Sequence, residues 1–201
     1  MTEKEKMLAG KLYEANGPEL LGERMRAKKI VYEYNHKHPE EFTFSDPLLR
    51  KLFGSTGEHF FIEPPFRCDY GYNISIGENF YSNYNCVMLD CAKITIGDNV
   101  LLGPNVSLFA AGHPLDVELR RKVEYAFPIT IGDDVWIGGN TVINPGVTIG
   151  SGTVIGSGSV VTKDIPSGVV AVGNPCRVLR KISEHDREFY FKNRRVDDPV
   201  E

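Results

Sequence analysis

The chain has 201 residues, of which 41% are hydrophobic, and a formal net charge of -4. This length allows one domain with a buried core and a small appendage, and the slightly acidic balance argues against nucleic acid as the main partner. No apolar run reaches membrane-spanning length, and the first residues, MTEKEKMLAGKLYE, lack the apolar stretch of a signal peptide, so we expect a cytoplasmic protein without membrane contact.

The first sixty residues are predicted to be helical. Thr2 and Glu5 have the spacing of a capping box. A short apolar stripe follows, made of Met7, Leu8, Leu12 and Tyr13. The segment GERMRAKKIVYEYNHKHPEE indicates a helix up to Pro39, and in SDPLLRKLFG a typical N-cap, Asp46, precedes a proline while Gly54 provides a stop. We expect residues 1–60 to cover one end of the remaining structure.

A six-residue repeat dominates the second half of the chain. An aliphatic residue returns at Ile131, Ile137, Ile143, Ile149, Ile155 and Val161. Small or β-branched residues return four positions after these, at Val135, Thr141, Val147, Thr153, Ser159 and Ile165. This period keeps no single helix face inward, whereas β-branched residues favour short strands, and glycine or asparagine favours turns with positive φ. The repeat therefore predicts a parallel β-helix in which three hexapeptides form one triangular coil around the aliphatic residues.

The same repeat is present less regularly before residue 110, at Ile76-Gly77, Ile96-Gly97 and Leu102-Gly103. It predicts one solenoid from about Ile74 to about Val172, with roughly four to five coils, inside a domain of residues 61–182. The flat sides of such a solenoid favour a symmetric homo-oligomer. In residues 183–201, SEHDREFYFKN is compatible with a short helix or an extended arm, whose aromatic side chains we expect to pack on the body.

One segment, HPLDVELRRKVEYAFP from His113 to Pro128, has no repeat. It must leave the triangle as a loop, about residues 110–128, and its flanking prolines and its aliphatic and aromatic anchors indicate that the loop is ordered. His113 opens it and is the only histidine of the solenoid region. A surface or hydrogen-bonded structural role is the simple alternative, but its position favours a general base.

A metal site is the competing chemical interpretation of His113. Some hexapeptide solenoids bind zinc through three histidines, and one histidine does not supply that set. The four cysteines form no CxxC pair, so we expect reduced thiols and no metal.

Several motifs together resemble the galactoside and maltose O-acetyltransferases, hexapeptide acyltransferases with a left-handed β-helix. These motifs are the Ile-Gly hexapeptides, AAGHPLD, PITIGDDVWIGGNTVINPGVTIG and VVTKDIPSGVVAVGNPCRV. AGKLYEA and YNHKHPEE resemble the N-terminal segment of the same family, and FRCDYGYN and CVMLD favour its maltose enzymes. The resemblance implies a homotrimer that transfers an acetyl group from acetyl-CoA to a sugar hydroxyl.

The resemblance also implies roles for individual residues. His113 would take the proton from the acceptor hydroxyl, and Asn83 would stabilise the oxyanion unless it is only a corner residue. The acceptor would contact Arg24, Asp69, Tyr81, Asn83 and Glu124, the last of which could instead orient His113. Acetyl-CoA would contact Trp136, Gly139, Ser157, Thr162, Lys163, Arg177 and Arg180.

The chemistry of the cofactor positions agrees with this assignment. Cations suit the phosphates of CoA, although a solvated basic cluster is the alternative for Lys163, Arg177 and Arg180. Small residues at one corner of successive coils would let the pantetheine arm approach the backbone. We expect Trp136, the single tryptophan, to occupy a corner as well.

Two positions differ from the galactoside enzymes in a way that affects the choice of acceptor. Ala15 and Cys91 stand where galactoside enzymes carry acidic residues, and Asp90 is a candidate for partial replacement. A glucose- or maltose-like acceptor therefore fits better than a galactoside. Another hydroxyl acceptor, such as a galactoside, an antibiotic or serine, stays open. So does a non-catalytic scaffold, which would need neither His113 nor the cations.

Overall fold

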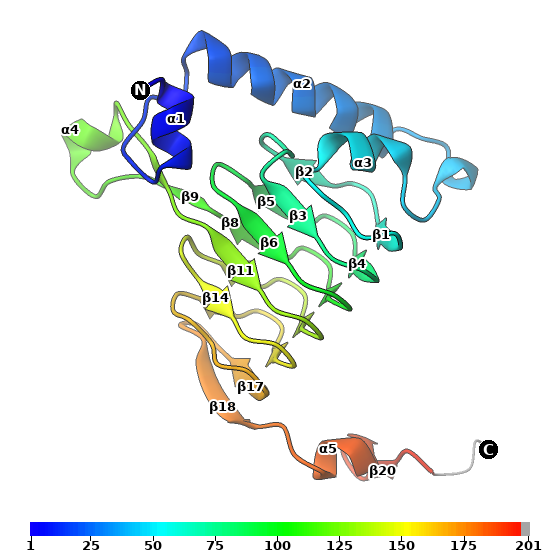
Figure 1. The fold of residues 1–201 in the computed structure, drawn as a ribbon. Helices are drawn as coiled ribbons and strands as arrows, with labels where there is room; N and C mark the ends of the chain where they lie inside the picture. Colours follow the sequence, from blue (N-terminus) through cyan, green and yellow to red (C-terminus); the bar gives the residue numbers. More distant parts are fainter. Residues whose placement is uncertain (198–201) are drawn as a thin grey trace.

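Helices cover the N-terminal end of a triangular solenoid in the computed structural model, which describes residues 1–197 (Figure 1). Their bounds are α1 Glu3–Leu8, α2 Pro18–Asn35, the 3₁₀ turn Pro39–Glu41 and α3 Pro47–Leu52. Thr2 and Glu5 form the predicted capping box, and Asp46 caps α3 by accepting from the Leu48 N–H. The predicted apolar stripe is confirmed only in part, because Leu8 and Leu12 are exposed.

Three parallel sheets form the walls of the triangle, and each is named here by its first strand. The β1 sheet contains β1 Phe60–Ile62, β4 Phe80–Ser82, β7 Leu101–Leu102, β12 Trp136–Ile137, β15 Val154–Ile155 and β17 Val169–Val172, with β18 Arg177–Lys181 added antiparallel. The β2 sheet contains β2 Arg67–Cys68, β5 Val87–Leu89, β8 Ser107–Phe109, β13 Val142–Ile143 and β16 Val160–Val161. The β3 sheet contains β3 Ile74–Ile76, β6 Ile94–Ile96, β11 Ile129–Ile131 and β14 Thr148–Ile149.

The solenoid is longer than its repeat predicts. It begins at Phe60 instead of Ile74, and six parallel strands stack in the β1 sheet, so the expectation of four to five coils was wrong. The first coil fills its interior with Phe60, Ile62 and Cys68, all buried, in place of the aliphatic-glycine pairs that reveal the later coils.

The glycines that follow the inward aliphatic residues have a different cause from the one predicted. Positive φ occurs two residues later, for example at Asp134 (φ 56°) and Gly152 (φ 65°). A Cβ on Gly132 would instead lie 2.7 Å from the Ser151 backbone nitrogen, and one on Gly97 would lie 2.8 Å from the Gly132 carbonyl carbon. Glycine is needed here because adjacent coils approach each other too closely for a side chain.

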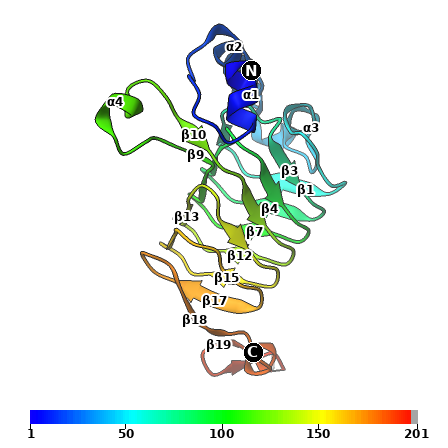
Figure 2. The ribbon, with the colours of Figure 1, turned by 60° about the vertical axis from the view of Figure 1, so that its left-hand side comes forward.

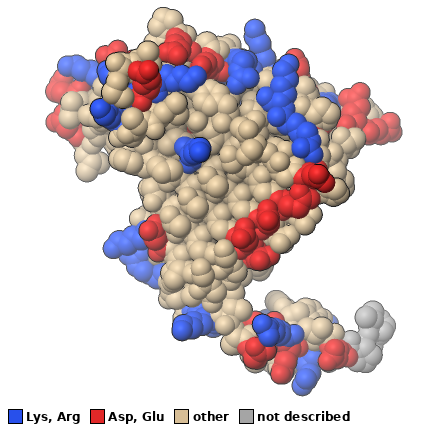
Figure 3. Space-filling model, in the orientation of Figure 1, with Lys and Arg blue, Asp and Glu red and all other residues tan. Residues whose placement is uncertain are grey.

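The corner between the β3 and β1 sheets carries a ladder of carboxylates. Asp98 Oδ1 accepts from the Glu78 N–H at 2.7 Å, and Asp133 Oδ1 accepts from the Asp98 N–H at 2.9 Å. Figure 3 shows a run of acidic side chains along one edge of the solenoid and few charges on the wall beside it. These carboxylates tie one coil to the next.

The segment without a repeat leaves the solenoid after β8 and returns at β11. It forms a hairpin of β9 Ala111–Gly112 and β10 Tyr125–Ala126, with α4 Val117–Arg120 at its tip. Figure 2 shows this hairpin projecting beside the N-terminal helices. The prediction of an ordered loop is confirmed.

The C-terminal arm comprises α5 His185–Glu188, β19 Phe189–Phe191 and β20 Arg194–Arg195, and lies away from the coils in Figure 1. Tyr190 and Phe191 are 62% and 57% exposed, so the expectation that its aromatic side chains pack on the body was wrong for these two. The arm instead pairs with itself through β19 and β20. No helix among the described residues is long and apolar enough to cross a membrane.

Candidate active site

The two edges of the β2 sheet hold most of the predicted site residues. Because its strands are parallel, the residues that follow them share one edge, called here the C-terminal edge, and those that precede them share the N-terminal edge. Asp69, the loop of residues 110–128 and Lys163 belong to the C-terminal edge. Asn83, Gly139 and Ser157 belong to the N-terminal edge.

His113 lies at the base of the projecting hairpin, directly after β9. Its imidazole is half exposed, and Nε2 is 3.8 Å from Glu124 Oε1, at the base of the returning strand. Glu124 is held in turn by Tyr13, whose hydroxyl donates to Oε2 at 3.1 Å. Two backbone hydrogen bonds also join Tyr13 and Glu124, so the N-terminal segment fixes the carboxylate that faces the histidine.

A second set of polar side chains continues from Tyr13 along the same edge. The Cys91 thiol lies 3.5 Å from Asp69 Oδ2 and also interacts with the Tyr13 hydroxyl. Burial raises the pKa of Asp69 above its ordinary value, while the Cys91 hydrogen bond and the Arg24 charge act in the opposite direction. Arg24 itself donates to the Tyr70 hydroxyl at 2.8 Å. The structure therefore brings together His113 and Glu124 of the hairpin, Asp69 after β2 and Arg24 of α2, which are three separate segments.

Asp90 does not replace the acidic residue absent at Cys91, so that expectation was wrong. Its side chain is fully buried, and it accepts the backbone N–H groups of Asp69, Tyr70 and Asn73. Burial raises its pKa to about 6 although these N–H groups favour the charged form. Asp90 shapes the turn that presents Asp69 and is not available to an acceptor.

Small residues stack at the N-terminal edge. Gly139 accepts from the Gly158 N–H on the next coil at 2.9 Å. A Cβ on Gly139 would lie 3.0 Å from the Pro104 oxygen, and a Cβ on Gly138 would lie 2.6 Å from the Ser157 nitrogen. Neither Gly138 nor Gly139 leaves space for a side chain between the coils.

Two predicted residues lie on the outer face of the neighbouring β1 sheet. Trp136 is 54% exposed and pairs with Leu101 and Val154 in the middle of the sheet, so its expected corner position was wrong. It precedes an inward isoleucine, which makes it an outward strand residue. Tyr81 also belongs to this sheet and stacks near Phe61, apart from the His113 group.

The predicted cations differ in their partners. Thr162 and Lys163 follow β16 at the C-terminal edge, and Lys163 has no ion pair among residues 1–197. Arg177 on β18 donates to the Cys176 carbonyl. Arg180 forms a bidentate pair with Asp186 at 2.7 and 2.6 Å, which lowers the pKa of Asp186. Arg180 is therefore already engaged.

One chain does not bring His113 and Asn83 together. Asn83 precedes β5 and His113 follows β8, the next strand of the same sheet. About six residues of strand therefore separate the two edges, which corresponds to roughly 20 Å. The chain therefore presents His113 and Asn83 at opposite edges of the β2 sheet.

No motif in the sequence points to Tyr13 as a site residue. It was predicted only as part of an apolar stripe, and 111 positions separate it from Glu124. All four cysteines are free and buried. Within residues 1–197, no three His, Cys, Asp or Glu side chains form a group that could hold a metal ion.

Two sequence profiles match the chain. Residues 6–57 match the maltose acetyltransferase hexapeptide capping motif, and residues 128–163 match the bacterial transferase hexapeptide repeats. A galactoside O-acetyltransferase of Escherichia coli (strain K12) is 50% identical over 98% of this chain and 97% of its own length.

Solved structures agree with these matches. A maltose O-acetyltransferase from Clostridium difficile 630 has 55% identity and a TM-score of 0.89, over 91% of this chain and 98% of that one. A galactoside acetyltransferase in complex with coenzyme A has 50% identity and a TM-score of 0.94, over 98% and 99% of the two chains. The helical cap and the β-helix of hexapeptide repeats are shared features of this group.

Proposed function

The chain belongs to the family of maltose and galactoside O-acetyltransferases, and we propose that it transfers an acetyl group from acetyl-CoA to a hydroxyl of a glucose- or maltose-like sugar. It is thus an acetyl-CoA-dependent O-acetyltransferase with the left-handed β-helix of its family. The observation that carries the proposal is the half-exposed imidazole of His113, set beside the Glu124 carboxylate at an edge lined by polar side chains.

His113 is the general base of the proposed reaction. It removes the proton of the acceptor hydroxyl while that oxygen attacks the thioester carbonyl carbon. The resulting tetrahedral intermediate expels the CoA thiolate, and the imidazolium returns the proton to it. Glu124 supports this role, because a carboxylate 3.8 Å from Nε2 favours the imidazolium formed in the transition state.

Asn83 stabilises the oxyanion of the intermediate by donating from its side-chain amide. Since it lies at the N-terminal edge of the β2 sheet, beside the corner assigned to acetyl-CoA and opposite the edge of His113, it acts together with the His113 of a neighbouring copy. We infer a homotrimer in which the C-terminal edge of one copy meets the N-terminal edge of the next, which yields three identical sites.

The acetyl-CoA assignment fits the N-terminal edge of one copy and Lys163 at the C-terminal edge of the next. The corner of Gly139 and Ser157 is where we place the pantetheine arm, because both residues are small and a Cβ on Gly138 or Gly139 would press against an adjacent coil, which keeps this corner free of larger side chains. Lys163 is available for a phosphate, and Trp136 offers an exposed ring on the neighbouring wall. The relative in complex with coenzyme A supports this choice.

The acceptor preference rests on the side chains around Asp69. Cys91 and the partly buried Ala15 provide no charge there, and Asp90 is enclosed by backbone. Asp69 and Glu124 are the carboxylates left to accept from sugar hydroxyls, with Arg24 nearby as a donor.

The direct test is turnover of acetyl-CoA with a panel of sugars, measured as free thiol. We expect activity with maltose and glucose to exceed that with galactosides. Hydrolysis without any sugar dependence, or no thiol release with any sugar, would contradict the proposal.

A further inference from the structure

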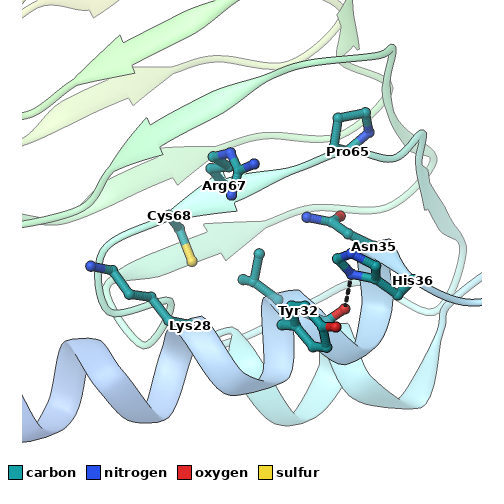
Figure 4. A pocket seen from close by; sticks show the side chains of 8 residues that line it. Lys28, Tyr32, Asn35, His36, Pro65, Arg67 and Cys68 are labelled. Atoms are coloured by element: carbon teal, nitrogen blue, oxygen red, sulfur yellow. Dashed lines mark hydrogen bonds between the residues drawn. The ribbon is translucent and has the colours of Figure 1, made fainter.

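A cavity of about 560 Å³ lies between helix α2 and strand β2. Figure 4 shows Lys28, Tyr32 and His36 on the helix, opposite the strand that carries Arg67 and Cys68. None of the residues assigned above to catalysis or to acetyl-CoA lines it. The roles assigned so far therefore leave this cavity unexplained.

The charges around the cavity are positive. None of its lining residues is acidic. Lys28 and Arg67 are exposed, and neither side chain forms a hydrogen bond or an ion pair within the part of the chain that the structure describes. Two such cations on separate elements suit an anion, since guanidinium binds carboxylate or phosphate in a bidentate manner and lysine adds a point charge.

The helix side of the cavity offers a flat ring surface. Tyr32 and His36 stack with their ring centroids 4.0 Å apart, and His36 Nδ1 is 2.8 Å from the Tyr32 carbonyl oxygen, which fixes the imidazole against the helix. Asn35 exchanges two hydrogen bonds with the Phe66 backbone and so holds the loop before β2 against α2. Exposed rings beside polar groups are suited to the apolar face of a sugar ring.

The cavity adjoins the acceptor side chains. Cys68 lines it, and the next residue, Asp69, contacts Cys91. Lys28 is one helical turn beyond Arg24 on α2, so both project from the same side of the helix. The charges of Glu124 and Lys28 both act on Asp69, so Asp69 is close to the His113 group and also to the cavity.

We propose that this cavity is an anion-binding extension of the acceptor site, which takes a phosphate or carboxylate attached to the sugar that is acetylated. The inference rests on the proposed function and narrows its substrate class to glycosides with an anionic substituent. Arg67 and Lys28 bind the anion, and the Tyr32–His36 stack supports the adjoining ring.

The experiment compares methyl α-glucoside with α-glucose 1-phosphate, which have the same free hydroxyls and differ in the charge at C1. The enzyme should acetylate both, with a KM about tenfold lower for the phosphorylated sugar. The variant Lys28→Met/Arg67→Gln should lose this preference while its KM for methyl α-glucoside stays the same. Lys29→Met is the matched control, because Lys29 is exposed on the same helix without lining the cavity.

Inhibition by inorganic phosphate tests whether the phosphate group of the acceptor binds in this cavity. It should inhibit turnover of glucose 1-phosphate competitively in the native enzyme and less in the double variant. Equal KM values for the two sugars, or a preference that survives the double variant, would overturn the inference while leaving acetyl transfer intact. Binding of phosphate without any preference for the phosphorylated sugar would also overturn it. Absence of turnover with both sugars would contradict the proposed function instead.

Discussion

Tyr13 and Glu124 are joined by three hydrogen bonds. The Tyr13 hydroxyl donates to Glu124 Oε2 at 3.1 Å, and the backbone groups of the two residues pair in both directions at 3.1 and 3.0 Å. The N-terminal segment thereby holds the hairpin that carries His113. This contact explains how a cap at the end of the solenoid contributes to the site at its edge.

Tyr13→Phe should lower kcat by about three- to tenfold, because the Glu124 carboxylate loses the donor that fixes it beside His113. The backbone pair stays, so the hairpin should keep its place. The KM for acetyl-CoA should not change, since Tyr13 lies far from the N-terminal edge. Steady-state kinetics and melting curves provide the check, with Tyr190→Phe in the exposed arm as the control. A changed KM for acetyl-CoA with normal kcat would show that Tyr13 does not position the catalytic group.

Mixed oligomers test whether the site is shared between copies. His113→Ala and Asn83→Ala should each be nearly inactive, and co-expression of the two with different tags should yield mixed trimers with roughly a third of native activity, since one interface in three of each mixed trimer then has both residues. The doubly tagged fraction should be purified and assayed. If both residues act within one chain, mixing restores nothing.

Substitutions of the cationic residues should differ in their effect on the KM for acetyl-CoA. Lys163→Ala should raise the KM for acetyl-CoA by about tenfold, because a phosphate contact is made alike in the ground and transition states. Arg180→Ala should have a smaller effect, since Asp186 already engages that guanidinium. Arg187→Ala on the exposed arm is the control. An acetyl-CoA KM that stays unchanged at low salt in Lys163→Ala would exclude a phosphate contact there.

Two glycine substitutions should shift stability in opposite directions. Gly97→Ala should destabilise by about 2 kcal/mol or more, because its Cβ would lie 2.8 Å from the carbonyl carbon of Gly132 on the next coil. Gly22→Ala in α2 should stabilise by about 0.5–1 kcal/mol, since its Cβ meets nothing within 4 Å. Denaturant unfolding measures both. Equal stability of the two variants would contradict the close approach of the coils.

Residues that repeat along the chain were predictable, and contacts between distant segments were not. The Ile131 series indicated the solenoid because one inward position returns every six residues. The first coil was not predicted, because Phe60 and Cys68 fill its interior without the aliphatic-glycine pair that marks the later coils. Trp136 directly precedes the inward Ile137, and this order in a strand already predicts an outward side chain. A corner position was expected instead.

Within the candidate site, the break in the repeat pointed to His113, and the family resemblance pointed to Glu124 in the same loop. The buried Asp90 looked available to an acceptor, since no local pattern reveals that three backbone N–H groups enclose it. Likewise, the role of Tyr13 depends on a fold that places the cap beside the hairpin.

The central claim is that His113 is the base in acetyl transfer, and His113→Ala tests it most directly. On one preparation, kcat, acetyl-CoA affinity and melting temperature should be measured together. We expect kcat to fall by about a hundredfold or more. Affinity and melting temperature should stay close to native values, because the side chain is half exposed and lies outside the coils. A decrease of only a fewfold in kcat in a folded protein, or a collapse of the melting temperature, would contradict the account.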